Sequence, residues 1–446
     1  MNIKKSILTA GLALGLMGAA SATNVTYISG STAFRSAANA ALATYCGAHG
    51  GVTNNWASDN TALGSAGNLL LTYTNGNGTN FVVVHWNGSE AGTQSAAGPA
   101  QGASNAATVN FFATNVATGW TNVTTSSSLA TNPHVSSGNF ADTYQSTSIF
   151  NGTVKGVTYS TLTGYDSGDG IVGVVAFTWV GSAGIPTNAN ITASTAQNLF
   201  LNNNEPLALI TGNAADSTNS VFLVGRNVDS GTRLTTLAET GFGVRGVVQT
   251  YAVGTNFTGG NSTTATITGT SATNEIFLYP IETIDGISSG SVGNSGYSSG
   301  GTLCGLMNTF YAQGSQLLIG TYNGAGTALT GTSAWTRTGS NFLVGYAGCS
   351  DAFGKTNSTS NSLVPLSYNG VAYSTNAIVQ GQYTFWGFEH LYYGANANVT
   401  DQAFLSALGA QILSTPTATL KPNLNYGDVT AVVSRNGDGL PVYPQY

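Results

Sequence analysis

Residues 221–238 read VFLVGRNVDSGTRLTTLA, and this stretch gives the clearest signal for the fold. A short apolar strand over 221–224 is followed by a turn rich in small polar residues over 225–232. Apolar residues at helical spacing come next, namely Leu234, Leu237 and Ala238. A strand, a polar turn and a helix start form the repeating unit of α/β proteins.

Strand candidates of the same kind recur along the chain. They are Phe81–Trp86, Ile171–Val180, Ser220–Gly225 and Asn341–Tyr346. Amphipathic helical patterns follow several of them, which predicts an α/β fold. Polar segments rich in Asn, Thr, Ser and Gly separate these units and are expected to form long surface loops or hairpins; they cover residues 52–78, 103–131, 255–274 and 322–338.

The N-terminus reads as a secretory signal peptide over residues 1–22. Lys4 and Lys5 precede an apolar stretch over residues 7–19, and Ala20-Ser21-Ala22 completes a small-residue cleavage site. A membrane anchor is the alternative, but the apolar stretch is short for a bilayer span. We therefore predict cleavage after Ala22 and a periplasmic or secreted protein.

Charge excludes several classes of partner. Without the two lysines of the predicted signal, nine basic residues face 17 acidic ones, a net charge of −8. So few cations cannot build the basic surface that nucleic acid or an anionic membrane requires. The hydrophobic fraction of 41% is high enough for a large core and argues against disorder.

Cysteines and histidines give no metal signature. Cys46, Cys304 and Cys349 are far apart, so at most one disulfide can form, and Cys304 with Cys349 is the preferred pair. The histidines are equally scattered and are interpreted as structural, at positions His49, His85, His134 and His390. We expect no metal and no cofactor.

Three turns carry residues suited to binding an anion. The first, SGSTAF over 29–34, directly precedes an apolar helical stripe and predicts Ser31 or Thr32 as the helix N-cap. A helix N-terminus with small residues suits an oxyanion, although an ordinary cap explains the same residues. The third turn, GSEAG over 88–92, presents Ser89 just beyond a strand, and a plain hairpin turn is the alternative there.

The second turn is the one quoted first, and it holds one of six arginines, Arg226. The planar guanidinium can bind two oxygens of a tetrahedral anion. Ser230 and Thr232 can donate hydroxyl hydrogen bonds, while Gly231 permits close approach of the backbone. The alternative role for Arg226 is a surface salt bridge, which is less favoured in a chain with so few cations.

The order of these motifs resembles that of the phosphate-binding proteins of bacterial phosphate ABC transporters, in the class II periplasmic binding-protein superfamily. The family's Gly-Ser-Thr turn ending in Phe is similar to residues 30–34, and its Gly-Ser-x-x-Gly turn to residues 88–92. Its Arg-x-x-x-Ser-Gly-Thr segment matches residues 226–232, and its Ile-Gly-Tyr strand resembles residues 344–346. Residues 190–200 and 366–383 resemble further stretches of the family, so the resemblance spans most of the mature chain.

The resemblance implies a two-lobed fold with a ligand cleft between the lobes. We expect residues 23–170 plus 355–446 to form lobe I and residues 171–354 to form lobe II. The implied phosphate ligands are Ser31, Thr32, Ala33, Phe34, Ser89, Asp142, Arg226, Asp229, Ser230, Gly231 and Thr232. Three positions depart from the family: Val228 stands where an acidic residue is usual, with Asp229 one place later, Ala33 replaces a threonine, and Ala141, next to Asp142, replaces a serine.

An acidic residue in such a site can select the ligand by its protonation state. A buried carboxylate accepts a hydrogen bond only from a ligand that carries a proton, so it admits hydrogen phosphate and repels sulfate. The three turns predict oxyanion binding. A preference for phosphate depends in addition on the acidic residues, and one of these is displaced here, from position 228 to Asp229.

The expected function is therefore capture of phosphate or a related oxyanion by a monomeric protein, for an ABC permease in the membrane. A cell-surface structural or adhesive protein on the same fold is the alternative. An enzyme would need a nucleophile with a base, or a metal cluster, and neither pattern is present in the sequence. Asp166 and Asp169 are interpreted as part of a solvated turn and not as a cation loop.

Overall fold

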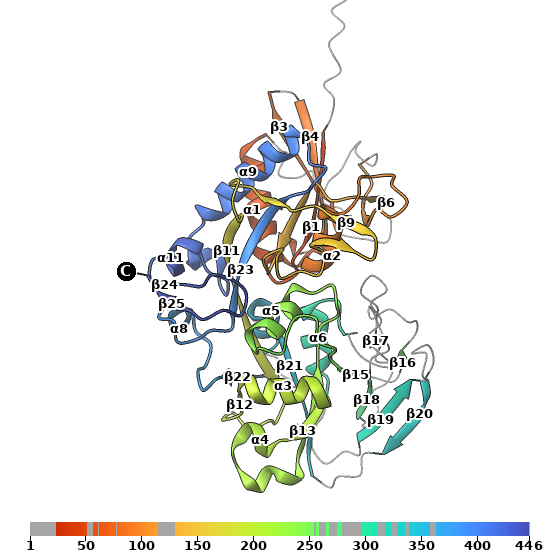
Figure 1. The fold of residues 1–446 in the computed structure, drawn as a ribbon, viewed down its shortest axis with the longest axis vertical. Coiled ribbons are helices and arrows are strands. Elements are labelled where there is room, and N and C mark those ends of the chain that lie inside the picture. The colour runs from red at the N-terminus through yellow and green to blue at the C-terminus, as the bar shows by residue number, and fades with distance from the viewer. Residues whose placement is uncertain are drawn as a thin grey trace, which may run out of the picture.

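A computed structural model gives the arrangement of the chain in two lobes, one above the other in Figure 1. The structure describes residues 24–50, 57–60, 62–76, 78–114, 130–253, 256–257, 265–266, 274–278, 296–310, 317–322, 329–334, 339–356 and 363–445. The predicted signal peptide and its cleavage site lie outside these ranges. Within them, no helix has the length and apolar character needed to cross a membrane.

One large mixed sheet runs through both lobes and confirms the α/β prediction. In spatial order its strands are β13 (Asn204–Pro206), β14 (Ser220–Val224), β21 (Asn341–Gly348), β11 (Ile171–Gly181), β23 (Trp386–Tyr393), β7 (Gly138–Ala141), β1 (Val25–Gly30), β4 (Gly78–His85), β3 (Asn68–Asn75) and β2 (Ala57–Ser58). All four strand candidates of the sequence are therefore strands, namely β4, β11, β14 and β21.

Strand β11 links the lobes. Its first half pairs with β23, next to β7 and β1 in the upper lobe, and its second half pairs with β21 in the lower lobe. Ten of its eleven residues are buried, as expected for a strand covered on both faces. The short strand β22 (Val364–Tyr368) pairs with the lower end of β11 and with β12 (Asn190–Ile191), so part of the segment assigned to lobe I contacts lobe II. The exact lobe boundaries remain a prediction.

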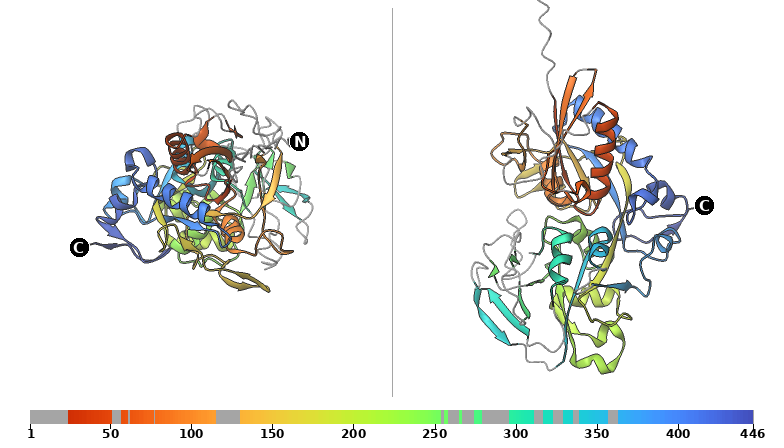
Figure 2. Two further views of the ribbon diagram at one scale, coloured as in Figure 1. Left: turned by 90° about the horizontal axis from the view of Figure 1, so that it is seen from above. Right: turned by 180° about the vertical axis from the view of Figure 1, so that it is seen from behind.

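Helices cover the sheet in both lobes (Figures 1 and 2). The upper lobe has α1 (Arg35–Ala48), α2 (Ser89–Ala97) and α9 (Val399–Leu413). The lower lobe has α3 (Ala193–Asn202), α4 (Ala208–Thr211), α5 (Gly231–Glu239), α6 (Gly300–Met307) and α7 (Cys349–Thr356). The C-terminal elements flank the joint between the lobes: α8 (Thr375–Val379), α10 (Thr417–Leu420), α11 (Tyr426–Thr430), β24 (Val433–Ser434) and β25 (Tyr443–Pro444).

A single main hydrophobic core follows the sheet through both lobes. It includes Phe34 at the start of α1, Trp179 on β11 and Trp386 on β23, each fully buried. Burial of side chains of this size is the main driving force for folding. Because the core is continuous across β11 and β23, the elements of both lobes pack onto the same core.

The described parts of the polar segments contain strands as well as loops. Residues 68–75 form β3, which makes a hairpin with β4 and joins the main sheet. Residues 329–334 form β20, the outer strand of a separate four-stranded sheet with β15 (Tyr251–Val253), β18 (Asn274–Leu278) and β19 (Leu317–Tyr322). Residues 115–129 and most of 255–273 lie outside the described ranges. Residues 103–108 form turns and loop, so both expected forms, loops and hairpins, occur in the described parts.

The remaining small pairs of strands are antiparallel. In the upper lobe β5 (Val109–Phe112) pairs with β6 (Thr131–His134), and β8 (Gly152–Val154) pairs with β9 (Val157–Tyr159). The two-residue strand β10 (Thr163–Gly164) pairs with the end of β23, and β16 (Asn256–Phe257) pairs with β17 (Ala265–Thr266).

The favoured disulfide is not formed. Cys46, Cys304 and Cys349 are buried thiols in the structure, so the preferred pairing of Cys304 with Cys349 is wrong for this state. These two thiols lie near each other at the contact of α6 and α7, and burial raises the pKa of Cys349 well above its ordinary value. A buried neutral thiol packs as a small apolar group and does not need to be bonded.

The histidines and the acidic turn have structural partners. His390 is fully buried, and its Nδ1 lies 2.7 Å from the carbonyl oxygen of Asp169. Asp166 accepts hydrogen bonds from the amides of Gly168 and Gly170 at 2.9 and 3.0 Å, which closes a tight turn. In the described part of the chain, no three His, Cys, Asp or Glu side chains are grouped so that they could hold a metal ion.

Candidate functional site

The turns singled out in the sequence meet where the two lobes touch. Strand β1 is parallel to both β4 and β7, so the turn after β1, the start of α2 and residue Asp142 lie at one edge of the sheet. The turn between β14 and α5 faces them from the lower lobe (Figure 1). The carboxyl ends of parallel strands are the usual place for ligand sites in α/β sheets.

The upper turn is fixed by its glycine. Gly30 has φ +126°, a conformation that side chains disfavour, and a Cβ there would lie 2.0 Å from the carbonyl oxygen of Phe140. The amide of Ser31 donates to that same carbonyl at 2.9 Å, and the amide of Gly88 donates to the carbonyl of Gly30 at 2.9 Å. The turn is thereby held between β7 and the start of α2.

The predicted cap of the first helix is displaced. Phe34, and not Ser31 or Thr32, is the N-cap of α1, because the chain needs residues 31–34 to turn away from β1 before helical geometry begins. The Ser31 hydroxyl accepts the amide hydrogen of Phe34 at 3.1 Å and donates to the carboxylate of Asp142. Ser31 therefore connects the helix start to a carboxylate instead of capping the helix in the standard position.

Arg226 is the charged centre of the lower turn. Its side chain is buried, and it donates to the carbonyl oxygens of Tyr297 and Ser298 at 3.0 and 2.9 Å. It also donates to the hydroxyl of Thr32 in the upper lobe at 3.1 Å and to that of Thr232 at 3.3 Å. Burial lowers the pKa of Arg226, and the nearby Asp351 and Asp142 oppose this shift. An arginine stays charged under such conditions.

Asp142 receives hydrogen bonds from both lobes. Besides Ser31, the hydroxyl of Thr232 lies 3.3 Å from its Oδ2, and its own amide donates to the hydroxyl of Ser89 at 3.2 Å. Burial raises the pKa of Asp142, while the Ser31 hydrogen bond and the Arg226 charge counteract the rise. The result is a chain of contacts from Arg226 through Thr232 to Asp142 and Ser31.

Gly231 lies at a close contact between the lobes. A Cβ at this position would lie 2.3 Å from the hydroxyl of Ser89 and 2.9 Å from Oδ2 of Asp142. Ser230 next to it is the N-cap of α5, and its side chain accepts the amide hydrogen of Arg233 at 3.3 Å. The start of α5 is thus directed at Ser89 and Asp142, and its first amides belong to the unpaired end of a helix.

Asp229 lies apart from the Arg226–Asp142 group. It is half-buried, its Oδ2 is 3.3 Å from the side-chain nitrogen of Asn227, and its carbonyl accepts the amide of Glu90 across the lobe contact at 2.9 Å. Glu90 is buried beside Ser148, and burial raises the pKa of Glu90 to about 7. Ala33 and Phe34 take part in the site through backbone atoms: the Phe34 amide donates to Ser31, and the Ala33 carbonyl accepts from Ser350. The ring of Phe34 packs in the core.

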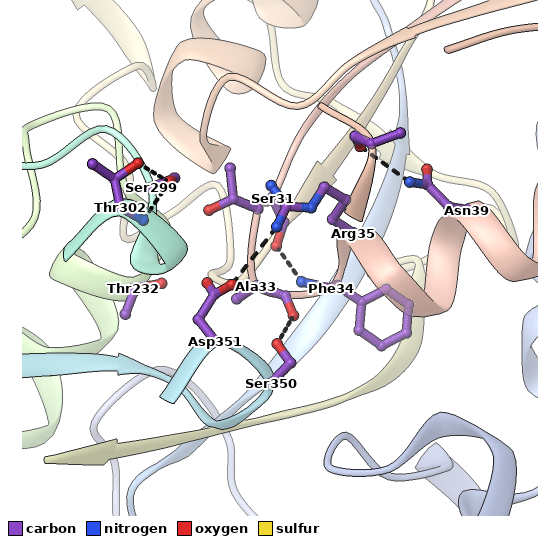
Figure 3. A network of polar contacts seen from close by, with 12 residues as sticks. Ser31, Ala33, Phe34, Arg35, Asn39, Thr232, Ser299, Thr302, Ser350 and Asp351 are labelled. Atoms are coloured by element: carbon purple, nitrogen blue, oxygen red, sulfur yellow. Dashed lines mark hydrogen bonds and ion pairs between the residues drawn. The ribbon is translucent and has the colours of Figure 1, made fainter. Parts of the chain in front are cut away.

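Figure 3 presents a second contact between the lobes, which the sequence analysis missed. The guanidinium of Arg35 lies 3.6 Å from Asp351, and the Ser350 hydroxyl donates to the carbonyl of Ala33 at 3.4 Å. Both Asp351 and Ser350 come from the first turn of α7. The position of residues 349–351 directly after a predicted strand was the signal that could have identified them.

A third acidic residue of the site was also missed. Glu389 lies in the middle of β23, is fully buried, and is near both Asp142 and Ser31. Burial, followed by the charge of Asp142, raises the pKa of Glu389 well above its ordinary value. A single acidic residue inside the apolar run WGFEHLYY, residues 386–393, was the available signal, because charged residues are almost never buried without a reason.

No protein-family model and no curated protein matches the chain. Among solved structures, the chain is similar to a substrate-binding protein with bound phosphate from Clostridium perfringens, at 12% identity and a TM-score of 0.41, covering 90% of this chain and 99% of that one. It is also similar to an ABC-type phosphate transport receptor from Vibrio cholerae, at 10% identity and a TM-score of 0.39, covering 86% of this chain and 93% of that one.

Proposed function

We propose that this protein binds phosphate, or a closely related tetrahedral oxyanion, between its two lobes, and that it acts as an exported solute-binding protein for an ABC importer. The proposed ligand contacts are the residues inferred from the sequence: Ser31, Thr32, the amides of Ala33 and Phe34, Ser89, Asp142, Arg226, Ser230, Gly231 and Thr232. Asp229 is proposed to act from the edge of the site. The importer as partner rests on the resemblance of motifs.

One observation carries the proposal: the buried guanidinium of Arg226 lies among hydroxyls contributed by both lobes. It contacts Thr32 of the upper lobe and Thr232 of the lower lobe. The hydrogen bonds of Arg226 go to neutral carbonyl and hydroxyl oxygens, and charge-assisted hydrogen bonds to an oxyanion are among the strongest that a protein makes. A ligand that displaces these contacts would receive donors from both lobes at once and so favour their closure.

Helix N-termini support the same ligand. Helices α1, α2 and α5 begin at or next to Phe34, Ser89 and Gly231, around the Arg226–Asp142 group. The positive ends of helix dipoles stabilise an anion without adding net charge. This explains how a protein with a net charge of −6 over its full length can bind a negative ligand.

Asp142 supports a preference for a protonated oxyanion. An ionised carboxylate accepts a hydrogen bond from a P–OH group, whereas sulfate has no proton to donate at neutral pH. Facing an unpaired buried charge costs roughly 3–5 kcal/mol, which corresponds to more than about 100-fold in affinity. We therefore expect phosphate to bind more tightly than sulfate.

The test is isothermal titration calorimetry of the ligand-stripped protein with phosphate and with sulfate, on the wild type, Arg226→Ala and Arg245→Ala. Arg245 is an exposed arginine of the same lobe and serves as the matched control. We expect phosphate binding at micromolar affinity or tighter. Removal of the Arg226 charge should weaken it at least about 30-fold, because truncating one partner of a buried charge pair costs about 2–5 kcal/mol.

Absence of binding heat with both anions would overturn the proposed function. Equal affinity of the Arg226→Ala and Arg245→Ala variants would overturn the assignment of the site. Tighter binding of sulfate than of phosphate would overturn the role given to Asp142 while leaving oxyanion binding in place.

A further inference from the structure

The pairing register places Glu389 next to Asp142. Strands β23 and β7 are antiparallel, with His390 opposite Ala141, so Glu389 comes opposite Asp142 one step beyond the end of β7. On its other side Glu389 pairs with Gly173 of β11. Opposite residues of neighbouring strands project to the same face of a sheet, which brings the two carboxyl groups together.

Glu389 has little to stabilise a negative charge. Its side chain is fully buried, and within the described residues no amide, guanidinium or hydroxyl group donates a hydrogen bond to either carboxyl oxygen. The groups that act on it are the Asp142 carboxylate and the Ser31 hydroxyl. Two adjacent buried carboxylates cannot both remain ionised, so one of the pair keeps a proton.

The surroundings indicate which carboxyl keeps the proton. Asp142 receives hydrogen bonds from Ser31 and Thr232 and is near the charge of Arg226, and all of these favour its ionised form. Asp351 acts on Arg226 and is balanced by Arg35. His390 follows Glu389 in the strand, projects to the opposite face and stacks on Tyr392. The pKa of Glu389 is the more strongly raised of the two.

We propose that Glu389 is a positioning residue of the oxyanion site: it holds a proton, shares it with Asp142, and thereby keeps Asp142 ionised and oriented as the acceptor for a protonated oxyanion. This inference rests on the proposed function. The selectivity for hydrogen phosphate over sulfate is then a property of the carboxyl pair and not of Asp142 alone.

The pair of Asp142 and Glu389 explains how the Asp142 carboxylate can remain a hydrogen-bond acceptor although it is buried from water. Without a donor behind it, Asp142 would lose part of its stabilisation and take up a proton itself. A protonated Asp142 can donate to any oxyanion, so it would no longer reject sulfate. Glu389 thus acts on specificity through Asp142 and needs no direct contact with the ligand.

The experiment compares phosphate and sulfate affinities at pH 7 for Glu389→Gln and Glu389→Ala. Glu205→Gln and Glu205→Ala are matched controls, because Glu205 is another buried glutamate, on β13 at the far edge of the sheet. A glutamine is neutral and keeps one donor, so we expect Glu389→Gln to bind phosphate within about 3-fold of the wild type. We expect Glu389→Ala to lower the phosphate-to-sulfate affinity ratio at least about 10-fold, the size of a lost hydrogen bond to a charged group. Both controls should leave the ratio unchanged.

Two results would overturn the inference while the wild type still binds phosphate. Tighter binding by Glu389→Gln of 10-fold or more would mean that Glu389 is ionised, and an unchanged ratio in Glu389→Ala would mean that it has no role. Absence of phosphate binding by the wild type would instead overturn the proposed function.

Infrared spectroscopy tests the proton itself, also if the variants fail to fold. At pH 9, above the pKa of about 7 of Glu90 and of Glu205, carbon-13 labelling of glutamate should shift a protonated-carboxyl band in the wild type. No labelled band at this pH would overturn the assignment of the proton to Glu389.

Discussion

The two turns that meet between the lobes are built from the same parts but use them differently. Each follows a buried strand, contains a glycine and leads into a helix. In the lower turn Ser230 caps α5, whereas in the upper turn the N-cap of α1 is Phe34 and has no side-chain cap. Ser31 instead reaches the Asp142 carboxylate. One serine mainly stabilises its own helix, and the other mainly holds a charged group of the site.

One sequence pattern can therefore serve stability or binding, depending on which residues face it. A small hydroxyl residue before an apolar helical stripe predicts a helix start in both turns. The position of Asp142, more than 100 residues after Ser31, decides that the first hydroxyl has another partner. The two turns should therefore respond differently to the same type of substitution.

The largest effect is expected from closing the space between the turns. In Gly231→Ala the added methyl group would lie 2.3 Å from the Ser89 hydroxyl, so the lobes would have to separate. Overpacking costs about 1–3 kcal/mol, and we expect phosphate affinity to fall up to about 100-fold. Gly305→Ala in α6 is the control, since a Cβ there meets nothing within 4 Å. Calorimetry that finds equal affinities for the two variants would contradict a closed site at Gly231.

A smaller loss is expected when the upper hydroxyl is removed. Ser31→Ala deletes the donor to Asp142 and the acceptor of the Phe34 amide. Removing one partner of a hydrogen bond to a buried charged group costs about 1.5–3 kcal/mol, so phosphate affinity should fall about 10- to 100-fold, with Ser31→Thr retaining more of it. If Ser31→Ala lowered only the unfolding free energy, the two turns would be equivalent.

The lower lobe also contains a buried glutamate, away from its turn, that makes the stability of the protein depend on pH. Glu205 on β13 is buried, and burial raises its pKa from 4.5 to about 7. The folded protein therefore binds a proton that the unfolded chain lacks between these values, so this contribution to stability is present below about pH 4.5 and is lost as the pH rises through 7. The unfolding free energy should fall between pH 5 and pH 8 by roughly 1–2 kcal/mol less in Glu205→Gln than in the wild type. Urea titrations at several pH values measure this, and parallel curves for wild type and variant would contradict it.

The smallest effect is expected at the lower cap. Ser230→Ala removes the acceptor for the Arg233 amide and should lower the unfolding free energy by about 1 kcal/mol, a usual value for an N-cap. Phosphate affinity should change less than in Ser31→Ala. Denaturant unfolding and calorimetry on the same two variants measure both quantities, and a greater loss of affinity in Ser230→Ala would reverse the assigned roles.

Local pattern predicted much of the fold, and long-range pairing decided the rest. The apolar runs 81–86, 171–180, 220–225 and 341–346 are strands, and most residues of each are buried. The extent of β11 through both lobes could not be read from its own residues, since it depends on three partner strands, β21, β22 and β23. The segment 52–78 contains β3 because Leu69, Leu70 and Leu71 can be buried against β4 despite polar flanks.

The site divides in the same way. Arg226, Ser31 and Gly231 stand in recognisable turns, and the structure brings all three to one place. Glu389 and Asp351 belong to no motif, and the sequence marks Glu389 only as an acidic residue in an apolar run. Their partners, Asp142 and Arg35, are set by which strand or helix lies beside them. Sequence reasoning finds residues in a local pattern, whereas residues that act through a neighbour on another strand require the fold.

The C-terminal tail gives the joint between the lobes a mechanical limit. Arg435 is bonded to Glu239 at the end of α5 at 3.1 Å and lies 4.2 Å over the ring of Trp386. Three residues later, Asp438 accepts the amide of Tyr144 in the upper lobe at 2.9 Å. Three residues of extended chain span at most about 11 Å. While both contacts are intact, residues 435–438 limit how far Glu239 and Tyr144 can separate. The opening of the lobes is then restricted by the C-terminal tail as well as by the strands that connect them.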